Sequence, residues 1–201
     1  MSKVLVIGAT GTIGKGIVEQ LSPEYEVIQV GYQDGDFQVD LGDKDSIKAL
    51  FQKAGSFDAL VSAAGLSKFG AFDALTDEDY YLGIHNKMMG QINLVREGLA
   101  YITDGGSFTL TSGMLSHSPT PMSVTISMVN SGLEGFTRAA ALAMPRGIRI
   151  NVVSPVFIKE TMEAMGMDGK YGMPASQAGI AYKESVESHR NGEVMDVRDF
   201  V

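Results

Sequence analysis

The stretch that determines the fold class is Val4-Leu5-Val6-Ile7-Gly8-Ala9-Thr10-Gly11-Thr12-Ile13-Gly14. Four consecutive apolar residues closed by a glycine are typical of a short buried strand. Apolar residues at helical spacing then follow until Pro23. Three glycines between such a strand and such a helix predict a tight turn whose backbone lets a pyrophosphate approach the helix N-terminus. The segment therefore predicts a nucleotide-binding strand, turn and helix.

Strand and helix patterns keep alternating along the rest of the chain. Further strands are expected at residues 25–30, 37–39, 57–61, 108–110, 148–153 and 193–197, and the clearest further helices at 46–51, 77–99, 126–144 and 175–186. Strands that are separated by helices pair in parallel through right-handed crossovers. We therefore expect one α/β domain over residues 1–201, a Rossmann-type doubly wound parallel sheet of about seven strands flanked by about six helices.

One segment breaks the regular alternation. Residues 162–174 contain four methionines and three glycines, and no apolar periodicity connects them. We expect this segment to form a flexible flap beside the sheet.

Composition and charge exclude several classes of function. The net charge of −8 and the scattered 16 basic residues argue against a nucleic-acid partner, which needs clustered Lys and Arg. The chain has no Cys, and its three His lie far apart, so no metal site is expected. Neither a signal peptide nor an apolar run long enough to span a membrane is evident, and a cytoplasmic protein with no membrane partner is expected.

The glycine turn resembles that of the short-chain dehydrogenase/reductase family, which reads Thr-Gly-x-x-x-Gly-x-Gly. Gly8 and Gly14 keep the separation of the outer glycines, whereas the middle glycine is displaced to Gly11 and Ile7 replaces the Thr. Other stretches are similar to family landmarks in the same order along nearly the whole chain: Val39-Asp40-Leu41, Ser62-Ala63-Ala64-Gly65, His85-Asn86-Lys87, Leu110-Thr111-Ser112-Gly113 and Asn151-Val152-Val153-Ser154-Pro155.

The resemblance implies a nicotinamide dinucleotide as cofactor and a set of residues around it. The implied cofactor-binding residues are Gly8, Thr10, Gly11, Thr12, Ile13, Gly14, Asp40, Leu41, Ala63, Ala64, Gly65, Asn130, Pro155 and Ile158. The implied catalytic residues are Ser112 and Asn86. Taken singly, Asp40, Asn86 and Ser112 are better explained as a turn residue, a helix-surface or helix-bending residue and a strand-end hydroxyl. Their shared order and spacing favour the family roles, and that preference comes from the resemblance.

The chain departs from the family at the catalytic pair. Alignment of the helix after Ser112 places the Tyr and Lys of the family's Tyr-x-x-x-Lys pair at Ile126 and Asn130. An Ile carries no proton, and an Asn can bind a ribose hydroxyl but supplies no positive charge to lower a neighbouring pKa. His117 and Tyr171 are candidates for a substitute acid, although each is also explained as a loop or packing residue.

Two functions remain open on this evidence. The first is an oxidoreductase that acts on an unknown small carbonyl or alcohol with an incomplete catalytic site. The second is a catalytically silent NAD(P)-binding sensor or assembly protein. The substitution of the family's Pro-Gly by Pro155-Val156, together with the acidic Glu160, raises the question of how the nicotinamide would be seated.

The sequence contains few features that distinguish an NAD site from an NADP site. Gly31-Tyr32-Gln33 supplies neither the acidic residue that holds the ribose hydroxyls of NAD nor a basic one for the 2′-phosphate of NADP. Lys15 beside the turn favours NADP, whereas Asp34 and Asp36 oppose it if they point inward.

A homodimer or homotetramer is the expected assembly. Family members usually associate through the two long helices that correspond to residues 77–99 and 126–144. The small side chains of Ala139-Ala140-Ala141-Leu142-Ala143 would allow close approach, although burial against the sheet also explains them.

Overall fold

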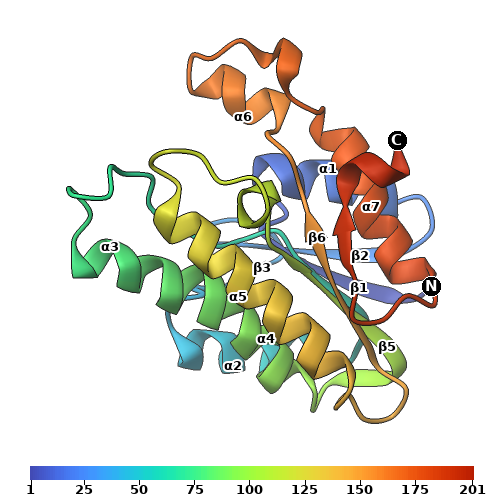
Figure 1. Ribbon diagram of the computed structural model, residues 1–201. Coiled ribbons are helices and arrows are strands. Elements are labelled where there is room, and N and C mark those ends of the chain that lie inside the picture. Colours follow the sequence, from blue (N-terminus) through green and yellow to red (C-terminus); the bar gives the residue numbers. More distant parts are fainter.

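The computed structural model describes residues 1–201 and contains one sheet of seven parallel strands (Figure 1). The strands follow the order β3-β2-β1-β4-β5-β6-β7. Their bounds are β1 Lys3–Ile7, β2 Glu26–Gly31, β3 Phe37–Gln38, β4 Phe57–Ser62, β5 Ile102–Thr111, β6 Arg149–Ser154 and β7 Val194–Asp196. The predicted Rossmann-type parallel sheet is confirmed, and its order reverses between β1 and β4.

Helices cover both faces of the sheet (Figure 1). Helices α1 (Thr12–Leu21) and α7 (Ala175–Glu187) pack on one face, and α2 (Lys44–Ala54), α4 (Met89–Gly98) and α5 (Val124–Ala141) pack on the other. The side chains of β1 alternate between these layers: Val4 and Val6 join the core under α1 and α7, and Leu5 and Ile7 the core under α2, α4 and α5. Because both faces are covered, β1 is apolar at consecutive positions.

Helices α1 and α7 approach each other at two glycines. A Cβ at Gly16 would lie 2.1 Å from the carbonyl oxygen of Ala175, and one at Gly179 would lie 2.5 Å from the carbonyl oxygen of Gly16. Only a residue without a side chain fits at these two points. The close crossing brings the start of α7 next to the glycine turn.

The helix expected at residues 77–99 is interrupted. Helix α3 (Asp77–Leu82) is capped by Thr76, whose side chain and that of Asp79 form a capping box. A π-helical turn, Gly83–Met88, separates α3 from α4. Such turns add one residue to the helix repeat and therefore change the direction in which the neighbouring side chains point.

Two further boundaries differ from prediction. Strand β5 begins at Ile102 rather than at Phe108, because a register shift against β4 between Phe57 and Ala59 accommodates the paired glycines 105 and 106. Helix α5 ends at Ala141 rather than at Met144, four residues before Pro145.

The segment expected to form a flap is attached at both ends. Helix α6 (Lys159–Ala164), which the sequence patterns did not predict, includes the first three residues of this segment. Met173 then returns to the chain before α6: its N–H donates to the carbonyl of Phe157 (2.9 Å), and its carbonyl accepts from Lys159 (2.8 Å). Between these anchors Met165, Met167 and Tyr171 are exposed. The flexibility of residues 162–174 stays a prediction.

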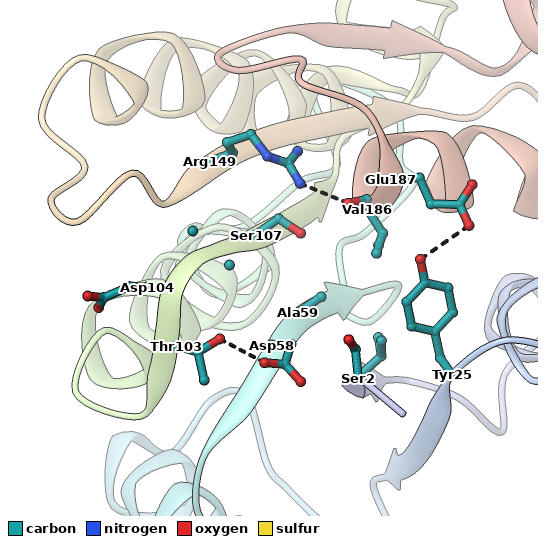
Figure 2. Close-up of a pocket in the computed structure, with 13 residues that line it drawn as sticks. Ser2, Tyr25, Asp58, Ala59, Thr103, Asp104, Ser107, Arg149, Val186 and Glu187 are labelled. Carbon is teal, nitrogen blue, oxygen red and sulfur yellow. Dashed lines mark hydrogen bonds between the residues drawn. The ribbon is translucent and has the colours of Figure 1, made fainter.

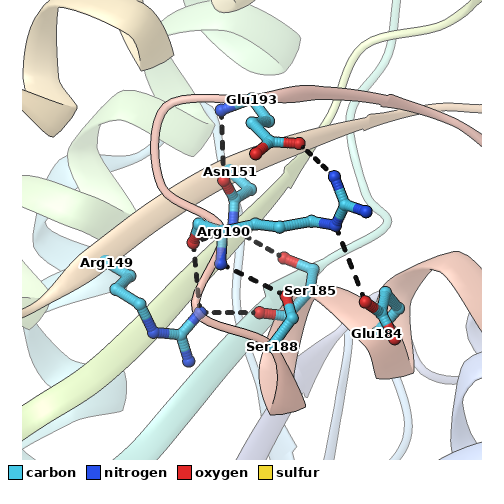
Figure 3. A network of polar contacts seen from close by, with 7 residues as sticks. All are labelled: Arg149, Asn151, Glu184, Ser185, Ser188, Arg190 and Glu193. Atoms are coloured by element: carbon cyan, nitrogen blue, oxygen red, sulfur yellow. Dashed lines mark hydrogen bonds and ion pairs between the residues drawn. The ribbon is translucent and has the colours of Figure 1, made fainter.

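Polar side chains join β6 to the end of α7 and the loop before β7 (Figure 3). The guanidinium of Arg149 donates to the carbonyls of Ser185 (2.9 Å) and Val186 (2.8 Å). The buried amide of Asn151 donates to the carbonyl of Arg190 (2.9 Å) and accepts from the N–H of Glu193 (3.1 Å). In this chain the Asn of the Asn-x-Val-x-Pro stretch therefore holds the sheet edge together. No helix has the length and apolar character needed to cross a membrane.

Candidate functional site

The glycine turn is built around its own backbone. The N–H groups of Gly8 and Ala9 donate to the carbonyl of Val30 on β2 at 2.7 and 3.2 Å, and Gly8 adopts a φ of 81°. A Cβ at Gly14 would lie 1.9 Å from the carbonyl oxygen of Gly8. Gly8 and Gly14 are therefore required for the turn itself.

Gly11 has a different role, because it is the N-cap residue of α1 and provides no side-chain cap. The first N–H groups of a helix lack partners within the helix and attract anions. The N-terminus of α1 is thus available to a phosphate group.

A cleft of about 450 Å³ lies beside this turn. It is at the carboxyl ends of β1, β2 and β4, where the strand order reverses. Nine of the residues predicted from the sequence line it: Gly8, Thr10, Gly11, Asp40, Leu41, Ala63, Ala64, Gly65 and Asn86. The other predicted residues, Thr12, Ile13, Gly14, Ser112, Asn130, Pro155 and Ile158, lie outside its lining.

The acidic residues near the end of β2 do not line this cleft. Gly31 and Tyr32 form the wall there. The carboxylate of Asp36, in the loop after β2, accepts from the N–H of Gln29 on β2 (2.8 Å). Asp40, which does line the cleft, accepts from the N–H of Gly42 (2.8 Å). The exposed Lys15 lies on a neighbouring cavity together with Thr12 and Glu160.

Asn86 and the following residue serve different parts of the site. The Asn86 side-chain oxygen accepts from the N–H of Leu66 (2.8 Å) on the cleft wall and makes no hydrogen bond to Ser112. Lys87 instead reaches past Gly65: its Nζ donates to Oδ1 of Asn130 (2.7 Å) and to the carbonyl oxygen of Ser112 (3.0 Å). Burial lowers the pKa of Lys87 to about 8.

Lys87 places beside Asn130 the positive charge that the Asn130 side chain itself lacks. The charge comes from the π-helical turn instead of from α5. Sequence reasoning missed it, although a Lys directly after a predicted site residue was a visible signal.

The hydroxyl of Ser112 makes no hydrogen bond to Asn130. It is buried and donates to Oε1 of Glu134 (3.1 Å) on α5. The residue that packs against the Asn130 amide is Gly113, because a Cβ at Gly113 would lie 2.9 Å from Nδ2 of Asn130. The structure therefore places Ser112 behind the Lys87–Asn130 pair, which it contacts through its carbonyl.

Glu134 gathers further groups around its buried carboxylate. Ser116 donates to Oε1 (2.5 Å), and Nε2 of His117 lies 3.0 Å from Oε2. The side chain of Glu134 is 2% exposed, whereas that of His117 is 60% exposed. His117 is thus paired with a buried acid rather than being an isolated loop residue.

Glu160 has a structural role. Its carboxylate accepts from the N–H of Ala175 at 3.0 and 3.2 Å, at the start of α7. A carboxylate at a helix N-terminus satisfies a free N–H and interacts favourably with the helix dipole. The side chain that raised doubt about nicotinamide seating is therefore occupied by α7.

Two other cavities differ in character from the cleft. One, of about 450 Å³, lies between the flap and the end of β6 and is lined by Met114, Val156, Phe157, Tyr171 and Met173, among others. Tyr171 faces this cavity and lies under Lys170, with Nζ 4.6 Å from the ring centre.

The other cavity, of about 470 Å³, lies at the amino edge of the sheet (Figure 2). Its polar groups bind one another: Thr103 donates to Asp58 (2.8 Å), and Tyr25 to Glu187 (3.2 Å). Ligands of open α/β sheets bind at the opposite edge.

Comparison with known proteins gives consistent matches over the whole chain. A family model described as Enoyl-(Acyl carrier protein) reductase matches residues 6–199. The crystal structure of the protein lin1944 from Listeria innocua superposes with a TM-score of 0.94, at 39% identity, over 98% of this chain and 100% of that one. A small-chain dehydrogenase in complex with NADPH superposes with a TM-score of 0.86, at 27% identity, over 97% of this chain and 95% of that one.

Curated relatives are more distant in sequence. Hydroxynaphthalene reductase-like protein Arp2 of Metarhizium brunneum (strain ARSEF 3297) is 26% identical over 203 residues, which cover 86% of this chain and 76% of that protein. Nodulation protein G of Rhizobium sp. (strain N33) is 27% identical over 183 residues, covering 80% of this chain and 74% of that protein.

Proposed function

Because the chain belongs to the short-chain dehydrogenase/reductase family, we propose that it is an oxidoreductase that binds NADP(H) in the cleft beside the glycine turn and acts on a small carbonyl or alcohol. The observation that carries this proposal is the convergence of nine predicted residues on one cleft. That cleft lies where the strand order reverses, which is the usual ligand site of such sheets.

The residues of the cleft fit a dinucleotide. Gly11 leaves the N-terminus of α1 open, and the only atom within 4 Å of a Cβ placed there is the carbonyl oxygen of Gly8. The helix N-terminus would hold the diphosphate, and the small side chains of Ala63 and Ala64 leave room for the chain of the cofactor. Asp40 and Leu41 form the wall that would face the adenosine half.

Two observations favour NADP(H) over NAD(H). Gly31 and Tyr32 present no carboxylate to a ribose 2′-position at the end of β2. A relative of 27% identity is known in complex with NADPH. Lys15 follows the turn in the sequence but lies on a separate cavity with Glu160 and Ala175, so the preference for NADP(H) does not rest on it.

The mechanism has two requirements: the cofactor must be positioned, and a proton must be transferred to or from the substrate oxygen. When bound, the nicotinamide ring gives a hydride to carbon or takes one from it. The chain would position this ring by holding the diphosphate on α1 and the adenosine half between Tyr32 and Asp40. Ile126 carries no exchangeable side-chain proton, so the group that gives a proton to the substrate oxygen must lie elsewhere.

A charge placed at Gly11 tests the binding site without breaking the helix. Asp and Asn are both favoured at an N-cap, but only Asp repels a diphosphate. We expect Gly11→Asp to bind NADPH at least about tenfold more weakly than Gly11→Asn, while the two ligand-free variants melt at similar temperatures.

Calorimetry and thermal melts would make this measurement. For the wild type, NADPH at 100 times Kd should stabilise by about 2.7 kcal/mol and raise the melting temperature by about 5 to 10 °C. Flat calorimetry with both NADPH and NADH at millimolar concentration would contradict the proposed function. A screen of NADPH oxidation with small aldehydes and ketones separates an enzyme from a silent binding protein.

A further inference from the structure

We propose that Lys87 is the cation of the active site and that its ammonium binds an oxygen atom of the ligand at the far end of the cleft. This inference rests on the proposed function. The oxygen belongs either to the nicotinamide ribose of the cofactor or to the carbonyl of the substrate, and both accept the same hydrogen bond.

The geometry leaves one donor of Lys87 unused. An ammonium has three N–H donors. Two of them are directed to Oδ1 of Asn130 (2.7 Å) and the carbonyl oxygen of Ser112 (3.0 Å). The side chain packs against Gly65, which lines the cleft. A ligand that extends from the cleft past Gly65 would meet the third donor.

The charge of Lys87 has no partner within the protein. Both acceptors are neutral, and no carboxylate lies within ion-pair distance of Nζ. The carboxylate of Glu134 is engaged by Ser112, Ser116 and His117. Burial is the cause that lowers the pKa of Lys87, which agrees with a charge that lacks compensation. A buried charge without a counter-charge is costly and marks a functional position.

Three local features of the backbone make room for this pair. Gly65 has a φ of 141°, and a Cβ there would lie 2.7 Å from Cγ of Lys87. Gly113 has a φ of 148°, and a Cβ there would lie 2.9 Å from Nδ2 of Asn130. The π-helical turn Gly83–Met88 contains Lys87 and sets the direction of its side chain. At both positions a residue with a side chain would be strained and would clash with the pair, so the two glycines and the π-turn together leave the space that Lys87 and Asn130 occupy.

The test is a reciprocal exchange of the two side chains. Lys87→Asn removes the ammonium, whereas the double variant Lys87→Asn with Asn130→Lys returns it from α5. Lys87→Met keeps the volume of the stem without the charge, and Lys48→Met, on the exposed side of α2, is a matched control. Binding is measured with NADPH and with 2′,5′-ADP, which lacks the nicotinamide ribose.

If the ribose is the partner, Lys87→Met and Lys87→Asn weaken NADPH binding at least about tenfold and leave the Kd of 2′,5′-ADP within about twofold. If the substrate carbonyl is the partner, NADPH binding is unchanged and kcat/KM falls by about a hundredfold or more. In either case the exchanged double variant recovers most of the loss and Lys48→Met shows none.

The pH dependence of the affected constant distinguishes a ligand-binding ammonium from a Lys87 that is only structural. The ammonium form binds the ligand, so the affected constant worsens as pH rises above about 8 in the wild type. The profile should be flat from pH 8 to 10 in Lys87→Met. Glu134, which Ser112 contacts, and its partner His117 also titrate, and they are present in both proteins.

The outcomes separate the two proposals. Unchanged NADPH binding and unchanged turnover in Lys87→Met would overturn the role of Lys87 while leaving the proposed function intact. An equal loss for NADPH and 2′,5′-ADP would also overturn it, because the damage would then be general. A wild type that binds neither cofactor would end both proposals.

Discussion

Ile126 lies at the helix position where the resemblance leads us to expect the family's proton-carrying Tyr, and the structure changes what a substitution there should do. The sequence alone predicts that both Ile126→Tyr and Asn130→Lys are needed, since a Tyr without a neighbouring cation keeps a pKa near 10. Lys87 already places an ammonium 2.7 Å from Asn130, one helical turn from Ile126. A single substitution should therefore be enough to create a cation-assisted Tyr.

We expect Ile126→Tyr to raise NADPH-dependent reduction of small aldehydes or ketones by about tenfold or more. The larger ring at a buried position would lower stability by about 1 to 3 kcal/mol. Rates of the wild type, Ile126→Tyr and Ile126→Phe would be compared on the same carbonyl panel. Equal rates for the Tyr and Phe variants, with NADPH binding retained, would show that the hydroxyl does not reach the reacting oxygen.

The buried carboxylate of Glu134 offers a second prediction at this scale. It accepts hydrogen bonds from Ser112 and Ser116 and pairs with His117. Glu134→Gln keeps the shape but replaces one acceptor oxygen with a donor, and we expect a loss of about 1 to 3 kcal/mol of unfolding free energy. His117→Ala should cost less, about 1 kcal/mol or below, because its side chain is largely exposed.

Urea denaturation of the two single variants and the double variant would measure these values. A double variant no less stable than Glu134→Gln would show that the His117 contribution depends on the carboxylate. A larger loss for His117→Ala than for Glu134→Gln would contradict the assignment of Glu134 as the centre of the cluster.

At the scale of elements, the crossing of α1 and α7 at Gly16 has a direct consequence for stability. A Cβ there would lie 2.1 Å from the carbonyl oxygen of Ala175, which is backbone and cannot rotate away. We expect Gly16→Ala to lower the unfolding free energy by about 1 to 3 kcal/mol.

Gly135 on α5 is the matched control, because no atom lies within 4 Å of a Cβ there. Gly135→Ala should raise the stability by about 0.5 to 1 kcal/mol through helix propensity. Chemical denaturation of both variants measures the difference. A neutral Gly16→Ala would mean that the two helices separate without cost.

The elements that short-range patterns specify were predictable, and those that depend on tertiary contacts were not. The strand at Val4 and the turn at Gly8 follow from a buried apolar run and its closing glycine. The π-turn at Gly83 interrupts a continuous helical pattern, and no local residue announces it. Helix α6 depends on Met173 returning to pair with the chain before it.

The site divides in the same way. The nine cleft residues follow from the glycine turn and from strand ends, which the order of the sheet brings together. The direction of Ser112 depends on the backbone at the end of β5, where Gly113 has a φ of 148°. The contact of Lys87 with Asn130 joins residues 43 positions apart and needs the π-turn, so spacing in the sequence does not reveal it.

At the scale of the whole molecule, exposed apolar side chains lie on α3 and at the start of α5, and the π-turn Gly83–Met88 that follows α3 packs against α5. Tyr81 and Leu82 on α3, and Val124 and Met128 on α5, are exposed, as is Phe72 in the loop before α3. Figure 1 shows α3 continuing into the layer that α4 and α5 form outside the sheet. Single exposed apolar residues are ordinary, but a group of them on neighbouring elements is typical of an association surface.

This distribution refines the predicted homo-oligomer. Two ends of α5 are available: Met128 near its start, and the small residues 139–141 with the fully exposed Leu142 at its end. We expect a dimer that uses the Met128 end, because the apolar residues of α3 extend the surface only there. Light scattering at micromolar concentration should give about twice the 21.5 kDa of one chain.

Met128→Glu should then shift the assembly to the monomer, since it places a charge in the centre of the apolar surface, where an unpaired charge is costly. Leu142→Glu should leave the dimer intact and is the matched control on the same helix. If Leu142→Glu gives the monomer and Met128→Glu does not, the interface lies at the C-terminal end of α5. A wild type that scatters as a 21.5 kDa particle would contradict the oligomer altogether, and the apolar group around Tyr81 and Met128 would then have to serve another partner.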